Sequence, residues 1–282
     1  MSPMHHATAL RMSSSDGDQG AGQGIGSGPP AAIIMAAGKG TRMRSDLPKV
    51  CHEVGGRPMV CAVVDACRNA GCDRIVVIVG YKQELVREAL ADESGVEFAV
   101  QEEQLGTGHA VRCAEQELAD ASDRDVFVLA GDGPLIRPET LKTLLARHRA
   151  ARASATMATS VIDDPSGYGR IVRSPAGSFE RIVEQKNATD VELKIREVNP
   201  SYYLFRCGEM FEALKDVKRN EASGEYYITD LPEMMLGEGK TVEVIDAVPA
   251  EDILSINTPE HLAEVDAIYR KRQQAAGVGG GA

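Results

Sequence analysis

The sequence has 282 residues and a formal net charge of −11, with 43% hydrophobic and 26% charged residues. This length and balance are those of a globular protein with a sizeable core, and the acidic charge argues against a nucleic-acid-binding surface, which would present a basic face. Because no apolar run approaches the roughly 20 residues that span a bilayer, and the first residues lack the apolar stretch of a secretory signal, we expect a cytoplasmic protein with no membrane partner.

The two ends of the chain differ in composition from its middle. Residues 13–30 are rich in Ser, Gly and Asp and end in a Pro-Pro pair, and residues 277–282 are mostly glycine. Such segments bury too little apolar surface to offset the entropy lost on ordering them. We therefore predict a disordered leader over 1–29, one folded domain over 30–276 and a flexible tail over 277–282.

Within the folded domain, short apolar runs alternate with helix-compatible stretches. The runs rich in Val, Ile and Phe predict strands over 31–35, 74–79, 96–100 and 125–129. The stretches between them predict helices over 59–70, 83–91 and 109–119. This alternation is typical of an α/β fold with a Rossmann-like, mostly parallel sheet and helices on both faces.

After residue 150 the alternation loosens. The runs there predict strands over 155–162, 170–173, 179–183 and 201–206, joined by turns. We expect these strands to form a small antiparallel region beside the main sheet. A closing helix is predicted from Pro259 to about residue 274, with Asn257 or Thr258 as its cap.

The loop after the first predicted strand concentrates positive charge. Its charged side chains are Lys39, Arg42, Arg44, Lys49 and Asp46, a net of +3 (4 − 1) in a protein of net charge −11. Small residues let a polyanion approach backbone N–H groups, and cations at a strand end neutralise it. The loop therefore predicts phosphate binding. The alternative is a surface turn with solvated cations; a Walker loop does not fit, because the spacer before Gly-Lys is missing.

Two more loops follow predicted strands, where parallel sheets bind their ligands. Asp132 stands between two glycines and suits a Mg²⁺ ligand, although Asp-Gly also stabilises ordinary turns. Gln101 offers the donor and acceptor that recognise a nucleobase edge, or it is a solvated residue at a strand end. Gly106 allows a ring to lie against the backbone. His109 fits either a catalytic role or the first turn of a helix, and we favour the structural role.

Four motifs in this order give the sequence a family resemblance. They occupy residues 36–43 with 47–49, 104–110, 167–171 and 225–230. Together they resemble the sugar-nucleotide pyrophosphorylases, and among these the uridyltransferase domain of the bifunctional N-acetylglucosamine-1-phosphate uridyltransferases. The resemblance runs from about residue 33 to about residue 270, so that 30–276 would be a nucleotidyltransferase domain.

The resemblance implies a role for each matching position. The catalytic residues would be Arg42 and Lys49, and the metal ligands for Mg²⁺ would be Asp132 and Asn257. The substrate-binding residues would be Met35, Ala36, Ala37, Gly38, Lys39, Gln101, Gly106, Thr107, Gly131, Gly169, Glu184 and Asn199. Within this set, residues 35–38 would hold the UTP phosphates, residues 101, 106 and 107 the uracil, and residues 169, 184 and 199 the sugar.

The implied reaction is the Mg²⁺-dependent transfer of UMP from UTP to N-acetylglucosamine 1-phosphate, which gives UDP-N-acetylglucosamine and pyrophosphate. The attacking phosphate is already an anion, so the reaction needs positioning and charge neutralisation rather than a strong general base. Lys49 and Arg42 suit that task. The alternatives are the same transfer with another sugar 1-phosphate or nucleoside triphosphate, or a non-catalytic nucleotide-sugar sensor.

Three features depart from the family pattern. Ala130 stands where the close family usually has an aromatic residue, and Pro200 with Ser201 replaces the Thr-Gly that follows the sugar-site asparagine. Only 25 residues follow Asn257 (282 − 257), and they contain no hexapeptide repeats. We therefore expect no acetyltransferase domain and no acetyl-CoA chemistry. Because that domain makes the family's trimer, we expect a monomer or a weak dimer whose partners are small-molecule substrates.

Overall fold

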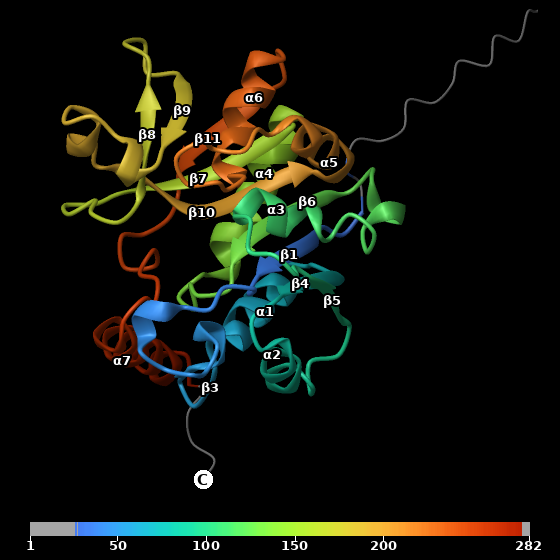
Figure 1. Cartoon of the computed structure of the whole chain (residues 1–282), viewed down its shortest axis with the longest axis vertical. Coiled ribbons are helices and arrows are strands. Elements are labelled where there is room, and N and C mark those ends of the chain that lie inside the picture. The colour runs from blue at the N-terminus through green and yellow to red at the C-terminus, as the bar shows by residue number, and fades with distance from the viewer. Residues whose placement is uncertain (1–25, 27, 278–282) are drawn as a thin grey trace, which may run out of the picture.

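The computed structural model describes residue 26 and residues 28–277. Residues 1–25, 27 and 278–282 lie outside the described residues, so the predictions for the leader and the tail stay predictions. The described chain forms a nine-stranded sheet with helices against it and a separate two-stranded hairpin, β2 (Glu53–Val54) with β3 (Arg57–Pro58) (Figure 1). Within this described part, no helix combines the length and the apolar character that crossing a membrane requires.

Four parallel strands form one half of the large sheet. β1 (Ala31–Met35) lies between β4 (Arg74–Val79) and β6 (Asp125–Ala130), and β5 (Val96–Val100) pairs with the outer side of β4. All four strands lie within one residue of their predicted bounds. Their nearly continuous apolar sequences suit a sheet that is covered on both faces. The loops after β1 and β6 consequently leave the same edge of the sheet as neighbours.

The other half of the sheet contains the antiparallel pairing. β10 (Glu197–Arg206) runs antiparallel between β6 and β7 (Ala155–Val161), and β11 (Val242–Asp246) lies parallel to β7. The hairpin of β8 (Gly169–Arg173) and β9 (Phe179–Val183) attaches to the start of β10. The predicted antiparallel region therefore exists, but it belongs to the main sheet rather than lying beside it.

Two of these strands differ from the prediction. β10 begins four residues before its predicted start, because the chain resumes pairing with β7 after a register shift between Val198 and Tyr202. β11 is absent from the prediction. Its side chains are only partly buried, and such a strand at a sheet edge carries a weak apolar pattern.

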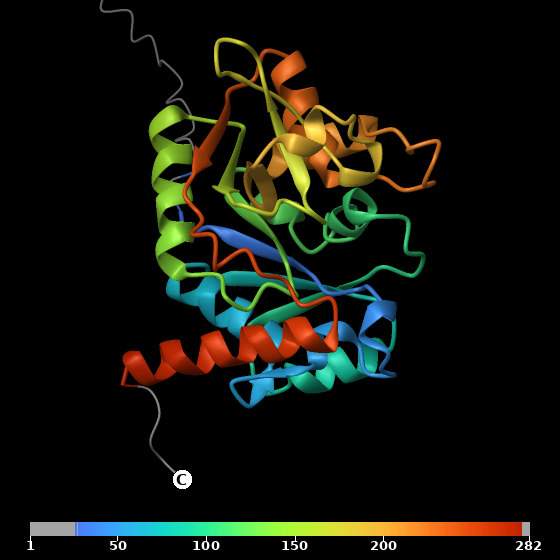
Figure 2. The ribbon, with the colours of Figure 1, turned by 90° about the vertical axis from the view of Figure 1, so that its left-hand side faces the viewer.

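Helices cover both faces of the sheet. Ala32 and Ile34 of β1 belong to an apolar cluster with α1 (Met59–Asn69), α2 (Gln83–Ala89), α4 (Pro138–Ala151) and α7 (Pro259–Ala275). Ala31 and Ile33 point to the opposite face, into a cluster with α3 (Thr107–Arg112), α5 (Cys207–Asp216) and α6 (Leu231–Gly237). Figure 2 shows α7 across the bottom of the view, with α4 upright beside the sheet.

The predicted helices are found with one clear difference. α1, α2 and α7 end within two residues of their predicted bounds, and the side chain of Thr258 caps α7. α3 starts at Thr107 and ends at Arg112, whereas the prediction ran to residue 119. Beyond Arg112 the chain continues in tighter turns, in which backbone N–H groups bond to carbonyls three residues earlier. The prediction lacks α4, α5 and α6.

Candidate active site

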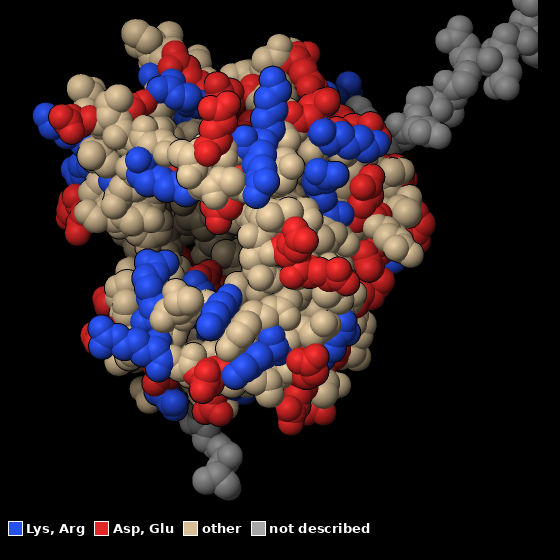
Figure 3. Space-filling view, viewed as in Figure 1, with Lys and Arg blue, Asp and Glu red and all other residues tan. Residues whose placement is uncertain are grey.

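A cavity of about 650 Å³ opens at the carboxyl edge of the parallel strands. Figure 3 shows the surface hollowed between the part over α7 and the part over the β8–β9 hairpin. Its lining includes seven predicted site residues: Arg42, Lys49, Asp132, Gly169, Glu184, Asn199 and Asn257. The cavity therefore gathers predicted cationic, metal-binding and sugar-binding residues from loops that lie far apart in the sequence.

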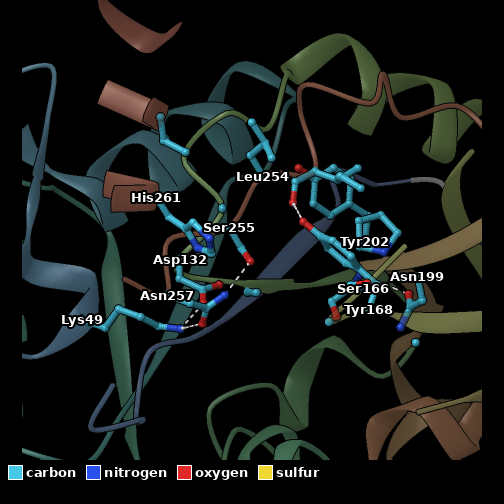
Figure 4. Close-up of a pocket in the computed structure, with 18 of the residues that line it drawn as sticks. Lys49, Asp132, Ser166, Tyr168, Asn199, Tyr202, Leu254, Ser255, Asn257 and His261 are labelled. Carbon is cyan, nitrogen blue, oxygen red and sulfur yellow. Dashed lines mark hydrogen bonds and ion pairs between the residues drawn. The ribbon is translucent and has the colours of Figure 1, made fainter. Parts of the chain in front are cut away.

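Lys49, Asp132 and Asn257 converge on one wall of the cavity (Figure 4). The Lys49 ammonium contacts the Asp132 carboxylate and donates a hydrogen bond of 3.1 Å to Asn257 Oδ1. Arg42 Nη2 donates a second bond of 2.8 Å to the same oxygen. Two cations therefore face a carboxylate and an amide oxygen, at a place where a phosphate and a metal ion find complementary charges.

Backbone contacts explain how these side chains meet. Gly131 N–H donates to the carbonyl of Met35 at 3.0 Å, and a Cβ at Gly131 would lie 3.0 Å from that oxygen. Only glycine allows this approach without displacing the loop after β1. Ile256 N–H donates to the Asp132 carbonyl at 3.1 Å, which draws Asn257 toward the same point. The order β6–β1 in the sheet thus places the metal-ligand candidates beside the cationic loop.

The opposite wall consists of the predicted sugar-binding residues. Asn199 is 6% exposed; its Oδ1 accepts from Ser201 N–H at 3.1 Å and its Nδ2 donates to the Tyr203 hydroxyl at 2.6 Å. Glu184 also lines this wall, and burial raises the pKa of its carboxyl, against the opposing effects of Lys186 and Thr229. Asn199 therefore holds the wall in shape through both of its polar groups.

Ser201 gives this wall an unusual backbone. Its φ is 65°, a left-handed conformation that costs a non-glycine residue roughly 1–2 kcal/mol. The bond from its N–H to Asn199 maintains the conformation, and Pro200 and Ser201 both line the cavity. The departure from the family pattern thus lies directly at the candidate sugar wall.

Three predicted base-binding residues form a separate cluster outside the cavity lining. Gln101 is 4% exposed, and its Nε2 donates to the Gly106 carbonyl at 3.1 Å. Thr107 Oγ1 accepts from the N–H of Ile228 at 3.0 Å. These contacts join the second and fourth sequence motifs. His109 belongs to this cluster too, with Nδ1 3.1 Å from Gln101 Nε2.

The predicted phosphate-binding backbone also lies outside the lining. This segment, residues 35–39, begins at the last residue of β1. It is anchored to β4 and its loop by bonds from Ala36 N–H to Ile78 O at 2.9 Å and from Tyr81 N–H to Ala37 O at 3.1 Å. The Lys39 ammonium lies 5.3 Å from the centre of the Tyr81 ring. Gly131 connects this segment to the cavity through its bond to Met35.

Several lining residues have no role in the sequence-based prediction. The main ones are Tyr168, Tyr202, Ser255, His261 and Glu264. Tyr168 lies inside the third motif, which is the only signal that the sequence offers for it. The others come from an interior strand, from the loop before α7 and from the first turns of α7, where local patterns do not indicate a cavity.

The donor set suits a hard divalent cation. Among residues 26 and 28–277, no group of three or more His, Cys, Asp or Glu side chains could hold a metal ion. Asp132 and Asn257 instead present a carboxylate and an amide oxygen that both contact the ammonium of Lys49, so both oxygens face one cationic point. Mg²⁺ commonly takes one or two protein oxygens and completes its shell with phosphates and water. The residues present therefore fit Mg²⁺.

Comparison with known proteins identifies the family. A family model described as the MobA-like NTP transferase domain matches residues 32–222. The chain is 46% identical over 241 residues to the bifunctional protein GlmU of Exiguobacterium sp. and 43% identical over 243 residues to that of Syntrophomonas wolfei, covering 86% of this chain each time. These matches cover 53% and 54% of the relatives, so the chain spans about half the length of the curated relatives that it matches.

A solved structure shares the fold of this chain. The crystal structure of UDP-glucose pyrophosphorylase complexed with UDP-glucose superimposes with a TM-score of 0.70 at 18% identity, over 86% of this chain and 99% of that one. The predicted α/β fold and the predicted family resemblance are thus confirmed. The chain belongs to the nucleotidyltransferase family of MobA-like NTP transferase domains.

Proposed function

We propose that this protein transfers UMP from UTP to N-acetylglucosamine 1-phosphate with the help of Mg²⁺, releasing pyrophosphate. One observation carries the proposal: Lys49, Asp132 and Asn257 meet at one wall of a cavity whose opposite wall holds Gly169, Glu184 and Asn199. The similarity to bifunctional GlmU proteins over 86% of the chain supports the choice of substrates.

In this proposal, the cationic side chains neutralise charge and the opposite wall positions the sugar. Lys49 and Arg42 would hold the oxygens of the phosphates that react, and a guanidinium grips such oxygens in two places. Both cations already lie within hydrogen-bond distance of Asn257, so they need little reorganisation. The opposite wall would orient the sugar so that its phosphate oxygen attacks the α-phosphorus in line.

Asp132 and Asn257 are the residues that would hold the metal ion. When bound, Mg²⁺ supplies positive charge that offsets the repulsion between two anionic substrates. The Lys49 ammonium now neutralises the Asp132 carboxylate directly. With nucleotide and metal present, the same ammonium would be released toward a phosphate oxygen.

Pyrophosphate release tests this proposal. The whole chain, mixed with UTP, N-acetylglucosamine 1-phosphate and Mg²⁺, should release one pyrophosphate for each UDP-N-acetylglucosamine formed. Replacement of UTP by ATP, CTP or GTP should abolish most of the release. If no combination in a panel of nucleoside triphosphates and sugar 1-phosphates releases pyrophosphate, the enzyme proposal fails and a nucleotide-sugar sensor takes its place.

A second candidate is the same transfer to a different sugar 1-phosphate. The observation that favours it is the Pro200–Ser201 turn, which lines the cavity beside Asn199 and has a left-handed backbone at Ser201. Comparing kcat/KM for the 1-phosphates of N-acetylglucosamine, glucose and N-acetylgalactosamine distinguishes the two candidates. We also propose that the protein is a monomer or a weak dimer, which light scattering of the purified chain measures.

A further inference from the structure

The segment 249–257 brings Asn257 to the cavity. It follows β11 and precedes α7, and it lines the cavity with Ile253, Leu254, Ser255 and Asn257. Most of this segment lacks regular secondary structure, so its position depends on side-chain and backbone bonds to its neighbours. These bonds therefore determine where the Asn257 oxygen lies.

Asp252 is one of the points at which the segment is fixed. Its side chain is 1% exposed and is not part of the cavity lining. Arg137, just before α4, places Nε 2.6 Å from Oδ2 and Nη2 2.9 Å from Oδ1. Arg272, on α7, places Nη2 2.5 Å from Oδ1. A buried carboxylate held by two guanidinium groups is a strong, directional anchor.

The same anchor includes the loop that carries Asp132. Arg272 also donates through Nη1 to the carbonyl of Leu135 at 3.1 Å, so one side chain binds both the loop after β6 and the segment 249–257. At the cavity end, Ile256 N–H bonds to the Asp132 carbonyl. The segment is thus bonded to the loop that carries Asp132 at two places, through Arg272 near Asp252 and through Ile256 next to Asn257.

Two tyrosines hold the segment from the sugar side of the cavity. The Tyr202 hydroxyl donates to the Asp252 carbonyl and the Tyr168 hydroxyl to the Ile253 carbonyl, each at 3.0 Å. Figure 4 shows both tyrosines beside Asn199, away from Lys49 and Asn257. Their rings line the cavity while their hydroxyl groups face the segment.

We propose that Asp252 is a positioning residue that keeps the oxygens of Asp132 and Asn257 at the spacing a divalent cation needs. The inference rests on the proposed function, which assigns both residues as ligands. Mg²⁺ demands nearly ideal octahedral geometry, so a small displacement of one ligand weakens binding. Without the carboxylate, Arg137 would lose its bonds to the segment and Arg272 would hold the segment only through Glu251, so the segment would be held less firmly. Changes in such outer partners typically cost 10–100-fold in metal affinity.

Metal binding measured without turnover tests the inference. The whole chain carrying Asp252→Asn is titrated with Mn²⁺, and the free ion is followed by electron paramagnetic resonance. We expect the Kd for Mn²⁺ to rise about tenfold relative to the wild type. In the pyrophosphate assay, the Mg²⁺ concentration for half-maximal rate should rise by a similar factor, with kcat at saturating Mg²⁺ changed by less than about twofold.

Asp266→Asn is the matched control. Asp266 lies on α7, the helix that carries Arg272, and accepts from Gly55 N–H at 2.7 Å and from Arg270 Nε at 2.7 Å. Neither partner lies in the segment 249–257. Its loss should lower stability without changing the Kd for Mn²⁺. If Asp252→Asn does not fold, Tyr202→Phe removes a single bond to the Asp252 carbonyl and should raise the Kd by a smaller factor.

Each result decides the inference. A Kd for Mn²⁺ in Asp252→Asn equal to that of Asp266→Asn overturns it, and so does a wild-type chain that binds no Mn²⁺. A wild-type chain that binds Mn²⁺ but releases no pyrophosphate overturns the proposed function only. In that case the Kd values of the two variants still determine whether Asp252 positions the ligands.

Discussion

Lys49 is the residue whose contacts join the two candidate metal ligands. Its ammonium contacts the Asp132 carboxylate and the Asn257 amide oxygen, which come from positions 83 and 208 residues further along the chain. The side chain is only 17% exposed, so a substrate phosphate would meet a cation with little competing water. Its charge should therefore matter most when charge develops on the reacting phosphates.

Replacing this charge should slow the chemical step. For Lys49→Ala we expect kcat to fall by about 100- to 1,000-fold with a small change in KM, because the lost contact strengthens in the transition state. Steady-state pyrophosphate release measures both constants. Lys82→Ala is the control, since Lys82 bonds the Asp46 carbonyl and lies outside the cavity lining. A rise in KM alone would assign Lys49 to ground-state binding.

Asp132 is the candidate metal ligand with a full negative charge. Asp132→Asn keeps the size of the side chain but removes that charge, so we expect turnover to fall by at least about 100-fold and excess Mg²⁺ to restore only part of it. Asp46→Asn, an exposed carboxylate in the neighbouring loop, should remain active. Full activity of Asp132→Asn at ordinary Mg²⁺ would refute the metal assignment.

At the scale of elements, the start of α3 depends on a glycine. Gly106 has φ of 97°, and a Cβ there would lie 2.5 Å from the Tyr226 carbonyl oxygen. This close approach lets Gly108 N–H bond to that oxygen at 2.8 Å and Tyr226 N–H bond to Leu105 O at 2.8 Å. The second and fourth motifs therefore fit together only because the position has no side chain.

Gly106→Ala should consequently destabilise the fold. We expect a loss of roughly 2–4 kcal/mol in the free energy of unfolding, from the positive φ of the backbone plus the clash with a carbonyl that cannot move freely. Urea denaturation gives this value. Gly177→Ala isolates the backbone cost, because Gly177 has φ of 84° but open space around a Cβ. Equal losses in both variants would mean that the contact with Tyr226 costs nothing.

For the whole molecule, a buried ion pair connects the sheet to α4 on the side away from the cavity. Asp125, at the start of β6, is fully buried, and Arg149 Nε donates to its Oδ2 at 2.7 Å. Burial alone would raise the pKa of Asp125, but the nearby His148 and the hydrogen bond and charge of Arg149 outweigh it, so the pKa is lowered.

This lowered pKa fixes the sign of the pH dependence. The ionised carboxylate stabilises the fold at pH values above the unfolded pKa of about 4, and that contribution is lost as the pH falls through the lower folded pKa. Asp125→Asn should therefore cost roughly 3 kcal/mol at pH 7 by leaving Arg149 unpaired, and less below pH 4. Urea denaturation at pH 7, 5 and 3 measures this. If the stability difference between Asp125→Asn and the wild type is the same at all three pH values, the assignment is wrong. The control is Asp120→Asn, which removes an exposed ion pair with Arg74 and should change the free energy of unfolding little.

The sequence by itself determined the local elements and the chemical character of the loops. The strands β1, β4 and β5 match their predicted bounds because apolar runs of this length have few other stable conformations in a sheet covered on both faces. The cationic loop and the Gly131–Asp132 turn were equally visible, because residue type alone indicates phosphate and metal chemistry there. The predicted roles of these residues stay predictions until the variants are measured.

Only the tertiary structure decided which loops meet. Asn257 reaches Lys49 because the order of strands places the loops after β1 and β6 side by side and because Ile256 N–H bonds to the Asp132 carbonyl. Contacts between residues more than 100 positions apart leave no periodic trace in the sequence. The pairing of Asp252 with Arg137, 115 positions away, is of this kind. The edge strand β11 likewise depends on its pairing with β7, which lies far from it in the sequence.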